Sequence, residues 1–227
     1  MLQSRHYLPK FLARRGFVYR EGTNWLRRLA AASSPLAPED QIVFGEYLGL
    51  LEYKRSRREE RDRRIAGLAL TPALAPAVNR LQCCRGVPPH VAMVLITGDG
   101  DWRRCESPRR LMAYLGLVPR EHSSGDRERR ASLTKAGDSH CRHVLVQAAW
   151  AYRYQPKVGI ALKARQRGQS PVVIAHAWKA QHRLHTLDQR LAFRTRPQLA
   201  VVAVARELVG FLWAVMCDQG GLTSATA

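Results

Sequence analysis

The feature that most limits the fold is a long segment of helical pattern between residues 39 and 66. It follows Pro38, which suits the first turn of a helix, and it opens with Glu39 and Asp40, whose charges suit the positive helix end. Its first half places apolar residues three and four apart, which predicts one apolar stripe. Those residues are Ile42, Val43, Phe44, Tyr47, Leu48 and Leu51. The chain is therefore expected to be mainly α-helical.

The second half of this segment, Lys54 to Arg64, is almost entirely charged. Glu59 and Arg63 stand four residues apart in the order that stabilises a helix. A charged helix half that buries little surface has to pack against a partner helix or cross solvent without one. Residues 72–81 are expected to return as the second arm of a coiled-coil-like helical hairpin. Two interpretations stay open: a solvated arm without a partner, or a helical surface that joins copies of the chain.

The charge of the chain indicates a polyanionic partner. Its 37 Lys and Arg against 18 Asp and Glu leave a formal net charge of +19, a surplus that folding does not need because like charges repel in the compact state. Arginine outnumbers lysine, which favours bidentate recognition of phosphate. A genome rich in G and C would also enrich arginine. Nucleic acid, above all DNA, is the expected partner.

Neither a membrane nor a secretory route is expected. Residues 1–22 are polar and basic without the apolar core of a signal peptide. The longest apolar run, Leu199 to Met216, is interrupted by Arg206 and Glu207, so a buried helix explains it better than a membrane span. The five cysteines are odd in number and irregularly spaced, as in a reduced cytoplasmic chain. We expect a bacterial cytoplasmic protein associated with the nucleoid.

No metal site is expected in this chain. His140, Cys141 and His143 lie close in sequence, but no second ligand pair at finger-like spacing accompanies them. The scattered carboxylates are expected to pair with neighbouring arginines or to end helices. They are Asp99, Asp101, Asp126 and Glu128.

Shorter helices are expected on both sides of the long one. Asp138 is placed to cap a helix that starts at Ser139. The expected helices are Leu8–Phe17, Trp25–Ala32, Val91–Ile96, Pro108–Leu115, Ser139–Tyr154, the basic amphipathic Trp178–Leu191, and Pro197–Met216. Turns are expected at Arg85–His90 and Thr97–Asp101, and two short helices around glycine turns are typical of a helix-hairpin-helix. Such a hairpin offers backbone amides, here at Gly86, to a DNA phosphate.

The segment from Gly116 to Gly137 is polar, basic and poor in apolar residues, so we expect a long exposed loop or a ribbon. It contains Ser123 and Ser124 followed by Gly125, whose backbone freedom lets a hydroxyl approach a bulky ligand. Guanidinium groups nearby can hold a scissile phosphate for a serine nucleophile. A flexible phosphate-binding loop with Ser and Gly as turn residues is the plainer alternative. The candidate phosphate ligands are Arg127, Arg129, Arg130, Lys135 and Arg142.

Several motifs resemble those of the insertion-sequence transposases of family 110/116/902. The resemblance is carried by Ser107 to Pro119, then Ser123-Ser124-Gly125, then Leu133 to Gly137. Further similar strings, in the same order as in the family, are Ala148-Ala149-Trp150, Ala177 to Gln181 and Ala205 to Leu208.

This resemblance implies a DNA recombinase of two parts: a RuvC-like domain with a metal-binding acidic tetrad, and a C-terminal transposase domain that supplies a serine. The serine of the Ser-Gly motif corresponds to Ser124, the expected catalytic nucleophile. Mg²⁺ is expected only with the RuvC-like domain, and some members use a guide RNA. The chain departs from the family at Ile96-Thr97, where a Glu is usual, and at Asp138, where Asn is common.

The resemblance covers the C-terminal part of the family, and the RuvC-like domain is expected to be missing from this chain. Three interpretations follow: a transposase part that works only with a RuvC-like partner, a non-catalytic remnant that binds nucleic acid, and, less favoured, a general RNA-binding protein. The expected organisation is a helical segment and charged arm at 1–80, a compact helical transposase domain at 81–217, and a disordered tail at 218–227.

Overall fold

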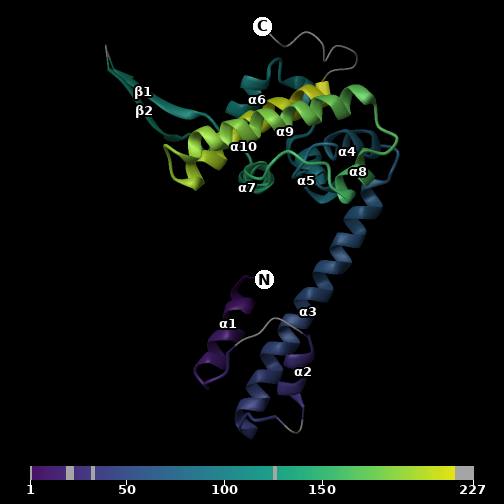
Figure 1. Ribbon diagram of the computed structural model, residues 1–227, viewed down its shortest axis with the longest axis vertical. Helices are drawn as coiled ribbons and strands as arrows, with labels where there is room; N and C mark the ends of the chain where they lie inside the picture. Colours follow the sequence, from purple (N-terminus) through teal and green to yellow (C-terminus); the bar gives the residue numbers. More distant parts are fainter. Residues whose placement is uncertain (1, 19–22, 32–33, 125–126, 218–227) are drawn as a thin grey trace. The chain divides into compact units, whose positions relative to one another are not determined.

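A computed structural model describes residues 2–18, 23–31, 34–124 and 127–217, with the backbone alone at 2–6, 23–24, 99 and 120–132. The fold class is confirmed: these residues are mainly α-helical, with one two-stranded antiparallel ribbon among them (Figure 1). The elements are α1 (Leu2–Ala13), α2 (Thr23–Ala30), α3 (Pro38–Ala69), α4 (Ala75–Leu81), α5 (Pro89–Asp99), η1 (Trp102–Arg104), α6 (Pro108–Tyr114), β1 (Pro119–Ser124), β2 (Arg127–Leu133), α7 (Ser139–Ala149), η2 (Trp150–Arg153), α8 (Ile160–Gln166), α9 (Pro171–Ala192) and α10 (Pro197–Cys217).

The chain forms two compact units, residues 1–64 and 65–227. This division lies inside α3, whereas the sequence places a boundary at residues 80/81. Seven-residue α4 packs against α5 and α10, so the expected returning arm is a short helix in the core of the second unit. The expected tail at 218–227 lies outside the described residues.

The first unit is held by apolar contacts among α1, α2 and the start of α3. Leu8, Leu12 and Phe44 are fully buried there, and an ion pair between Arg15 and Asp40 ties the end of α1 to the first turn of α3. Only part of the expected apolar stripe faces inward, because Ile42 is 72% exposed and Val43 is 41% exposed. The two short helices cover one side of α3 and leave these neighbours in solvent.

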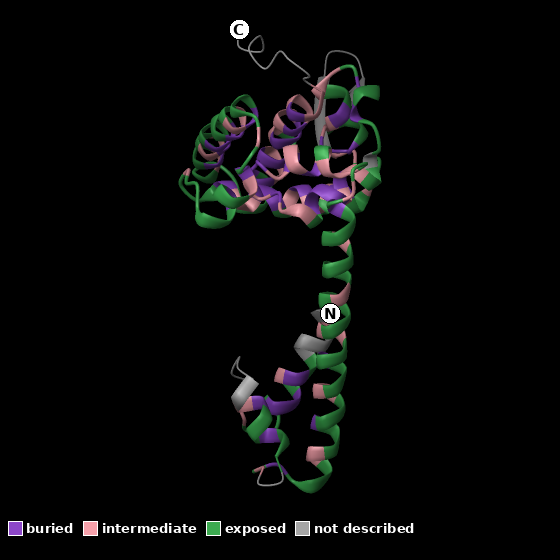
Figure 2. Ribbon diagram, turned by 90° about the vertical axis from the view of Figure 1, so that its right-hand side faces the viewer, coloured by how far each residue is buried: buried purple, intermediate pink, exposed green. Residues whose placement is uncertain are grey.

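The charged half of α3 forms pairs along its own surface. Arg64 binds Glu60 at 2.5 Å and Arg58 lies 3.5 Å from Asp62, both at the i, i+4 spacing. These groups are exposed, so such pairs contribute only a few tenths of a kcal/mol each. Figure 2 shows this stretch mostly in the exposed colour, with some turns of intermediate burial.

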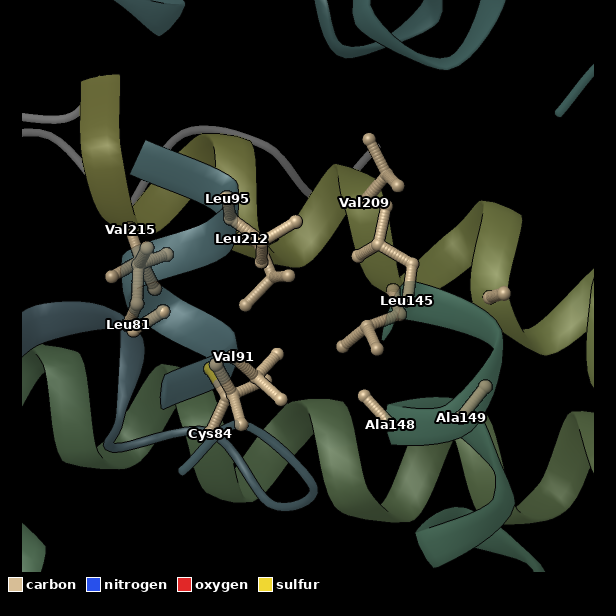
Figure 3. Packing of buried hydrophobic residues seen from close by; sticks show 14 of the residues in the cluster. Leu81, Cys84, Val91, Leu95, Leu145, Ala148, Ala149, Val209, Leu212 and Val215 are labelled. Carbon is tan, nitrogen blue, oxygen red and sulfur yellow. The ribbon is translucent and has the colours of Figure 1, made fainter. Parts of the chain in front are cut away.

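The second unit is built around α10, which packs against α4, α6, α7 and α9. Figure 3 shows Leu212, Val209 and Val215 of α10 meeting side chains from α4, α5 and α7. α10 is long and apolar enough to cross a membrane by composition alone, yet Val204, Leu208 and Leu212 are fully buried inside the unit. The prediction of a buried helix at 197–216 is confirmed.

The turn between α4 and α5 packs closely against α7 and α8. Gly86 has a φ of +79°, and a Cβ built there would lie closer than 3.0 Å to the carbonyl oxygen of Ala148. Arg165 of α8 donates to the carbonyl oxygen of Val87 at 2.6 Å, and Gln166 donates to that of Cys83 at 3.0 Å. Burial lowers the pKa of Arg165, although it stays charged at neutral pH.

The expected turn at residues 97–101 is wrong for its first residues, because α5 continues through Gly98 to Asp99. A Cβ on Gly98 would lie closer than 3.0 Å to Cys141 Sγ of α7 and to Oδ2 of Asp138, the residue before α7. The glycine therefore permits a close approach of two helices instead of a change in chain direction.

Candidate nucleic-acid interface

The Ser-Gly segment is a β-ribbon, one of the two forms expected for it. β1 pairs with β2 so that Ser124 lies opposite Arg127 and His122 lies opposite Arg129, with an irregularity between Pro119 and Glu121. Arg130 pairs with Glu121. Figure 1 shows the ribbon leaving the helices of the second unit. The backbone thus brings the predicted nucleophile and one predicted phosphate ligand together as the last described pair before the tip.

The tip itself, residues 125–126, lies outside the described residues, and the predicted site residue Gly125 is one of the two. For Ser124, Arg127, Arg129 and Arg130 the structure describes the backbone only. Their predicted roles stay predictions.

The root of the ribbon is held by close backbone contacts. Thr134 donates to the carbonyl oxygen of Val118 at 3.0 Å, and Lys135 donates to that of Gly116 at 3.3 Å. Gly116 and Gly137 have φ values of +66° and +68°, and a Cβ on either would lie closer than 3.0 Å to the facing backbone. The two glycines therefore let the two ends of the ribbon meet.

The predicted ligands Lys135 and Arg142 lie at this root. Lys135 is exposed and has a φ of 54°, an uncommon conformation for a side chain with a Cβ. Arg142 is half-buried, and its Nη1 donates to the carbonyl oxygens of Ala136 at 2.7 Å and Leu115 at 3.0 Å. Arg142 thus joins the two ends of the ribbon, and Lys135 is the freer of the two to meet a phosphate.

Asp138 caps α7 as predicted. Its Oδ1 accepts hydrogen bonds from the backbone of His140 at 2.6 Å and of Cys141 at 3.4 Å. These bonds stabilise the charged form, the one from His140 most, and lower the pKa of the carboxyl. The cap fixes the start of the helix that carries Arg142.

Gly86, predicted to offer an amide to a phosphate, is explained by packing against Ala148. This contact with Ala148 does not test whether the Gly86 amide also binds a phosphate. Across the residues whose side chains the structure describes, no three His, Cys, Asp or Glu side chains come close enough to hold a metal ion.

A groove of about 780 Å³ lies at the root of the ribbon and was not foreseen. Its walls include Leu117 and Leu133 beside the strands, and the exposed Arg109 of α6 and Arg206 of α10. Arg183 of α9 also lines it, and its Nε donates to Glu207 at 2.6 Å. Arg109 and Arg206 both stand in motifs quoted above, but only the fold shows that they line the same groove.

The surroundings of the ribbon can be compared with known proteins. Residues 78–160, which include the ribbon and its root, match the model of the transposase IS116/IS110/IS902 family. The chain belongs to this family of transposases. A putative transposase, y4qE, of Sinorhizobium fredii is 44% identical over 153 residues, which are 67% of this chain and 39% of that protein.

Other family relatives extend the similarity. A probable family 20 transposase of Pseudomonas aeruginosa is 30% identical over 142 residues, or 63% of this chain and 36% of its own length. The transposase for insertion sequence element IS1533 of Leptospira borgpetersenii is 25% identical over 192 residues, or 81% of this chain and 54% of its own length. The chain therefore spans less than two thirds of these transposases. All the predicted site residues, from Gly86 to Arg142, fall inside the family segment.

Proposed function

We propose that the chain is the DNA-binding part of a transposase that moves an insertion sequence, and that Ser124 is its nucleophile. The observation that carries the proposal is the pairing of Ser124 with Arg127 next to the tip of a ribbon, inside the segment that matches the family. A hydroxyl beside guanidinium groups suits attack on a phosphodiester.

The proposed step is a transesterification. The Oγ of Ser124 forms a bond to phosphorus while the bond from phosphorus to one sugar oxygen breaks. The serine hydroxyl gives up its proton, and the departing sugar oxygen takes one. One phosphodiester replaces another, so no energy-rich co-reactant is needed. Arg127, Arg129, Arg130 and Lys135 are proposed to neutralise the charge that gathers on the phosphate oxygens.

The root of the ribbon supports this role because it limits how the strands can move. Arg142 and the close contacts at Gly116 and Gly137 fix where the strands leave the helices. The groove with Arg109 and Arg206 adds cations next to the ribbon. A DNA backbone lying along the strands would meet them, and phosphate contacts of this kind position a duplex without reading its sequence.

The acidic domain, Mg²⁺ and a guide RNA enter this proposal only through the family resemblance. Mg²⁺ bound by a RuvC-like domain would supply charge stabilisation at the phosphate. We propose that this chain holds no metal ion of its own; among the side chains that the structure describes, no three His, Cys, Asp or Glu residues form a candidate site. We place the protein in the bacterial cytoplasm, at the nucleoid.

A second copy of the chain is proposed to pack along α3. Leu50 is 44% exposed and Tyr53 is 61% exposed, directly before the charged stretch from Lys54 to Arg64. Light scattering at moderate salt would show a dimer that Leu50→Glu with Tyr53→Glu converts to a monomer. A wild-type chain that is monomeric at every concentration would contradict this part of the proposal.

The nucleophile is tested by covalent trapping on end-labelled DNA that carries an insertion-sequence end. A full-length relative whose own Ser-Gly serine is replaced by alanine supplies the acidic domain. We expect a labelled adduct of the wild-type chain on a denaturing gel, its loss in Ser124→Ala, and its retention in the matched neighbour Ser123→Ala. An adduct that survives Ser124→Ala contradicts the assignment. No adduct from the wild-type chain would favour the alternative, a non-catalytic remnant that binds nucleic acid.

A further inference from the structure

The segment after the ribbon carries an excess of basic residues that the chemistry proposed at the ribbon does not use. Between Ser139 and Leu187 the sequence has no Asp or Glu, while it has eight Lys and Arg and five His. This segment contains α7, η2, α8 and most of α9. Such a one-sided charge favours a polyanion at this surface.

Two exposed aromatic rings stand within this segment. Tyr154, in the link between η2 and α8, is 69% exposed, and Trp178 of α9 is 41% exposed. The ring of Trp178 meets His182 edge-on, with ring centres 4.5 Å apart. Lys157 of the link and Lys179 of α9 are exposed. We call the surface formed by Tyr154, Lys157, Trp178, Lys179 and His182 the aromatic–basic face.

Three hydrogen bonds hold η2 and the link after it, two of them to α9 and one to the turn before α5. The backbone N–H of Lys157 donates to Gln181 Oε1 at 3.1 Å, and His185 Nδ1 lies 3.1 Å from the carbonyl oxygen of Tyr152. Arg85, from the turn before α5, donates to the carbonyl oxygen of Gln155 at 2.7 Å. The backbone of the link is therefore held beside α9 before any ligand arrives, which reduces the entropy that binding costs.

Trp178, Lys179 and His182 of α9 are exposed, and no carboxylate of α9 stands among them. Figure 1 shows α9 lying in front of α10, with its outer side towards the viewer. The single acidic residue of α9, Asp188, is 7% exposed on the inner side. Glu207 of α10 pairs with Arg183 at the border of this surface.

We propose that the aromatic–basic face binds an unpaired nucleic-acid strand. Lys157 and Lys179 contact its phosphates, and unpaired bases stack on Trp178 and Tyr154. Exposed rings beside cations suit a single strand, because the bases of a duplex are already stacked on each other. The proposal does not depend on Ser124 or on the ribbon, so it can fail while the proposed function stands.

The test measures fluorescence anisotropy of labelled strands of about 12 nucleotides, within the usual site size of single-strand binders. Mixed-sequence DNA, RNA of the same sequence, and the matching DNA duplex form the three arms. For the single strands, Trp178→Ala and Tyr154→Ala are each expected to raise Kd at least about fivefold, the lower end of the effect of losing one stacked base. Trp178→Phe keeps a ring and is expected to restore most of the affinity.

The charges are tested through salt dependence. Lys157→Gln with Lys179→Gln is expected to lower the slope of log K against log salt by about 1.4, because each phosphate contact on a single strand contributes about 0.7. Phe193→Ala and the pair Arg27→Gln with Arg28→Gln are matched controls. They remove an exposed ring and two exposed cations outside this surface. Far-ultraviolet circular dichroism confirms that each variant is folded.

A loss confined to the single-strand arms supports the proposal, and the DNA and RNA arms show which strand is preferred. Equal losses for duplex and single strand would overturn it, since stacking then plays no part. It is also overturned if the control variants lose as much affinity as the variants of the aromatic–basic face. Tighter binding to vesicles of anionic lipid than to either strand would likewise refute it.

Discussion

Replacing Gly86 by alanine should destabilise the second unit much more than the same change at Gly168. Both glycines have a similar backbone conformation, with φ values of +79° and +74°. A Cβ on Gly168 meets no atom within 4 Å, whereas one on Gly86 would lie closer than 3.0 Å to the carbonyl oxygen of Ala148. The pair therefore separates the cost of a positive φ from the cost of a clash with backbone.

The expected magnitudes follow from these two terms. A left-handed conformation costs an alanine roughly 1–2 kcal/mol, and both variants share that loss. The clash adds roughly 1–3 kcal/mol for Gly86→Ala alone, because the facing atom belongs to a helix backbone and cannot rotate away. At about 2–4 °C per kcal/mol for a unit of this size, Gly86→Ala should melt roughly 2–12 °C below Gly168→Ala.

Thermal unfolding of the whole chain, followed by circular dichroism at one protein concentration, measures the difference. Urea unfolding of the same variants checks that the ranking holds at constant temperature. If the two variants lose the same stability, Gly86 in the turn before α5 does not pack against the backbone of Ala148 in α7. The packing reason given for Gly86 would then be wrong.

Three further predictions concern the root of the ribbon and the buried thiols. Arg142→Met should speed hydrogen exchange of the β1 and β2 amides and leave that of α10 unchanged, because Arg142 joins Leu115 to Ala136. Equal protection of the ribbon amides in variant and wild type would contradict this role of Arg142. Because the folded carboxyl of Asp138 has a lowered pKa, its stabilising contribution is present above the usual carboxyl range and is lost as pH falls through the folded pKa. Asp138→Ala should therefore be less stable than wild type at pH 7 and differ less at acidic pH, whereas an unchanged gap in urea titrations would refute the cap. Burial raises the pKa of Cys83 to about 11 and of Cys84 to about 12. At pH 8 a thiol reagent should therefore label half-buried Cys217 first, and Cys83 and Cys84 only after unfolding.

The elements that the sequence predicts well are those with a local cause. The last helix, expected at 197–216 and found at Pro197–Cys217, is marked by a continuous apolar pattern after Pro197. The cap at Asp138 depends only on the backbone of His140 and Cys141, two and three residues later in the chain. The long helix was expected at 39–66 and runs from Pro38 to Ala69.

Features that depend on distant parts of the chain were missed. Nothing near Gly98 in the sequence shows that Cys141 of α7 will lie against it, so a glycine inside a helix suggested a turn. α8 was not foreseen because its anchors, Arg165 and Gln166, bind carbonyl groups about 80 residues earlier in the chain. Ile42 is exposed because the two short helices cover only one side of α3. The spacing of apolar residues in α3 does not show how much of the helix they will cover.

The candidate site was predictable in composition but not in geometry. The sequence singled out Ser124 and its basic neighbours, and the fold adds the register that pairs Ser124 with Arg127. It also joins Arg109 to Arg206 in one groove, although they are almost a hundred residues apart in the chain.

The central claim is that Ser124 joins covalently to DNA, and peptide mass spectrometry of the trapped adduct tests it most directly. After nuclease digestion, the peptide that spans β1 and β2 should carry a nucleotide remnant on Ser124, and this remnant should be absent when the donor DNA is omitted. A remnant on Ser123, or on any residue outside the ribbon, would contradict the claim.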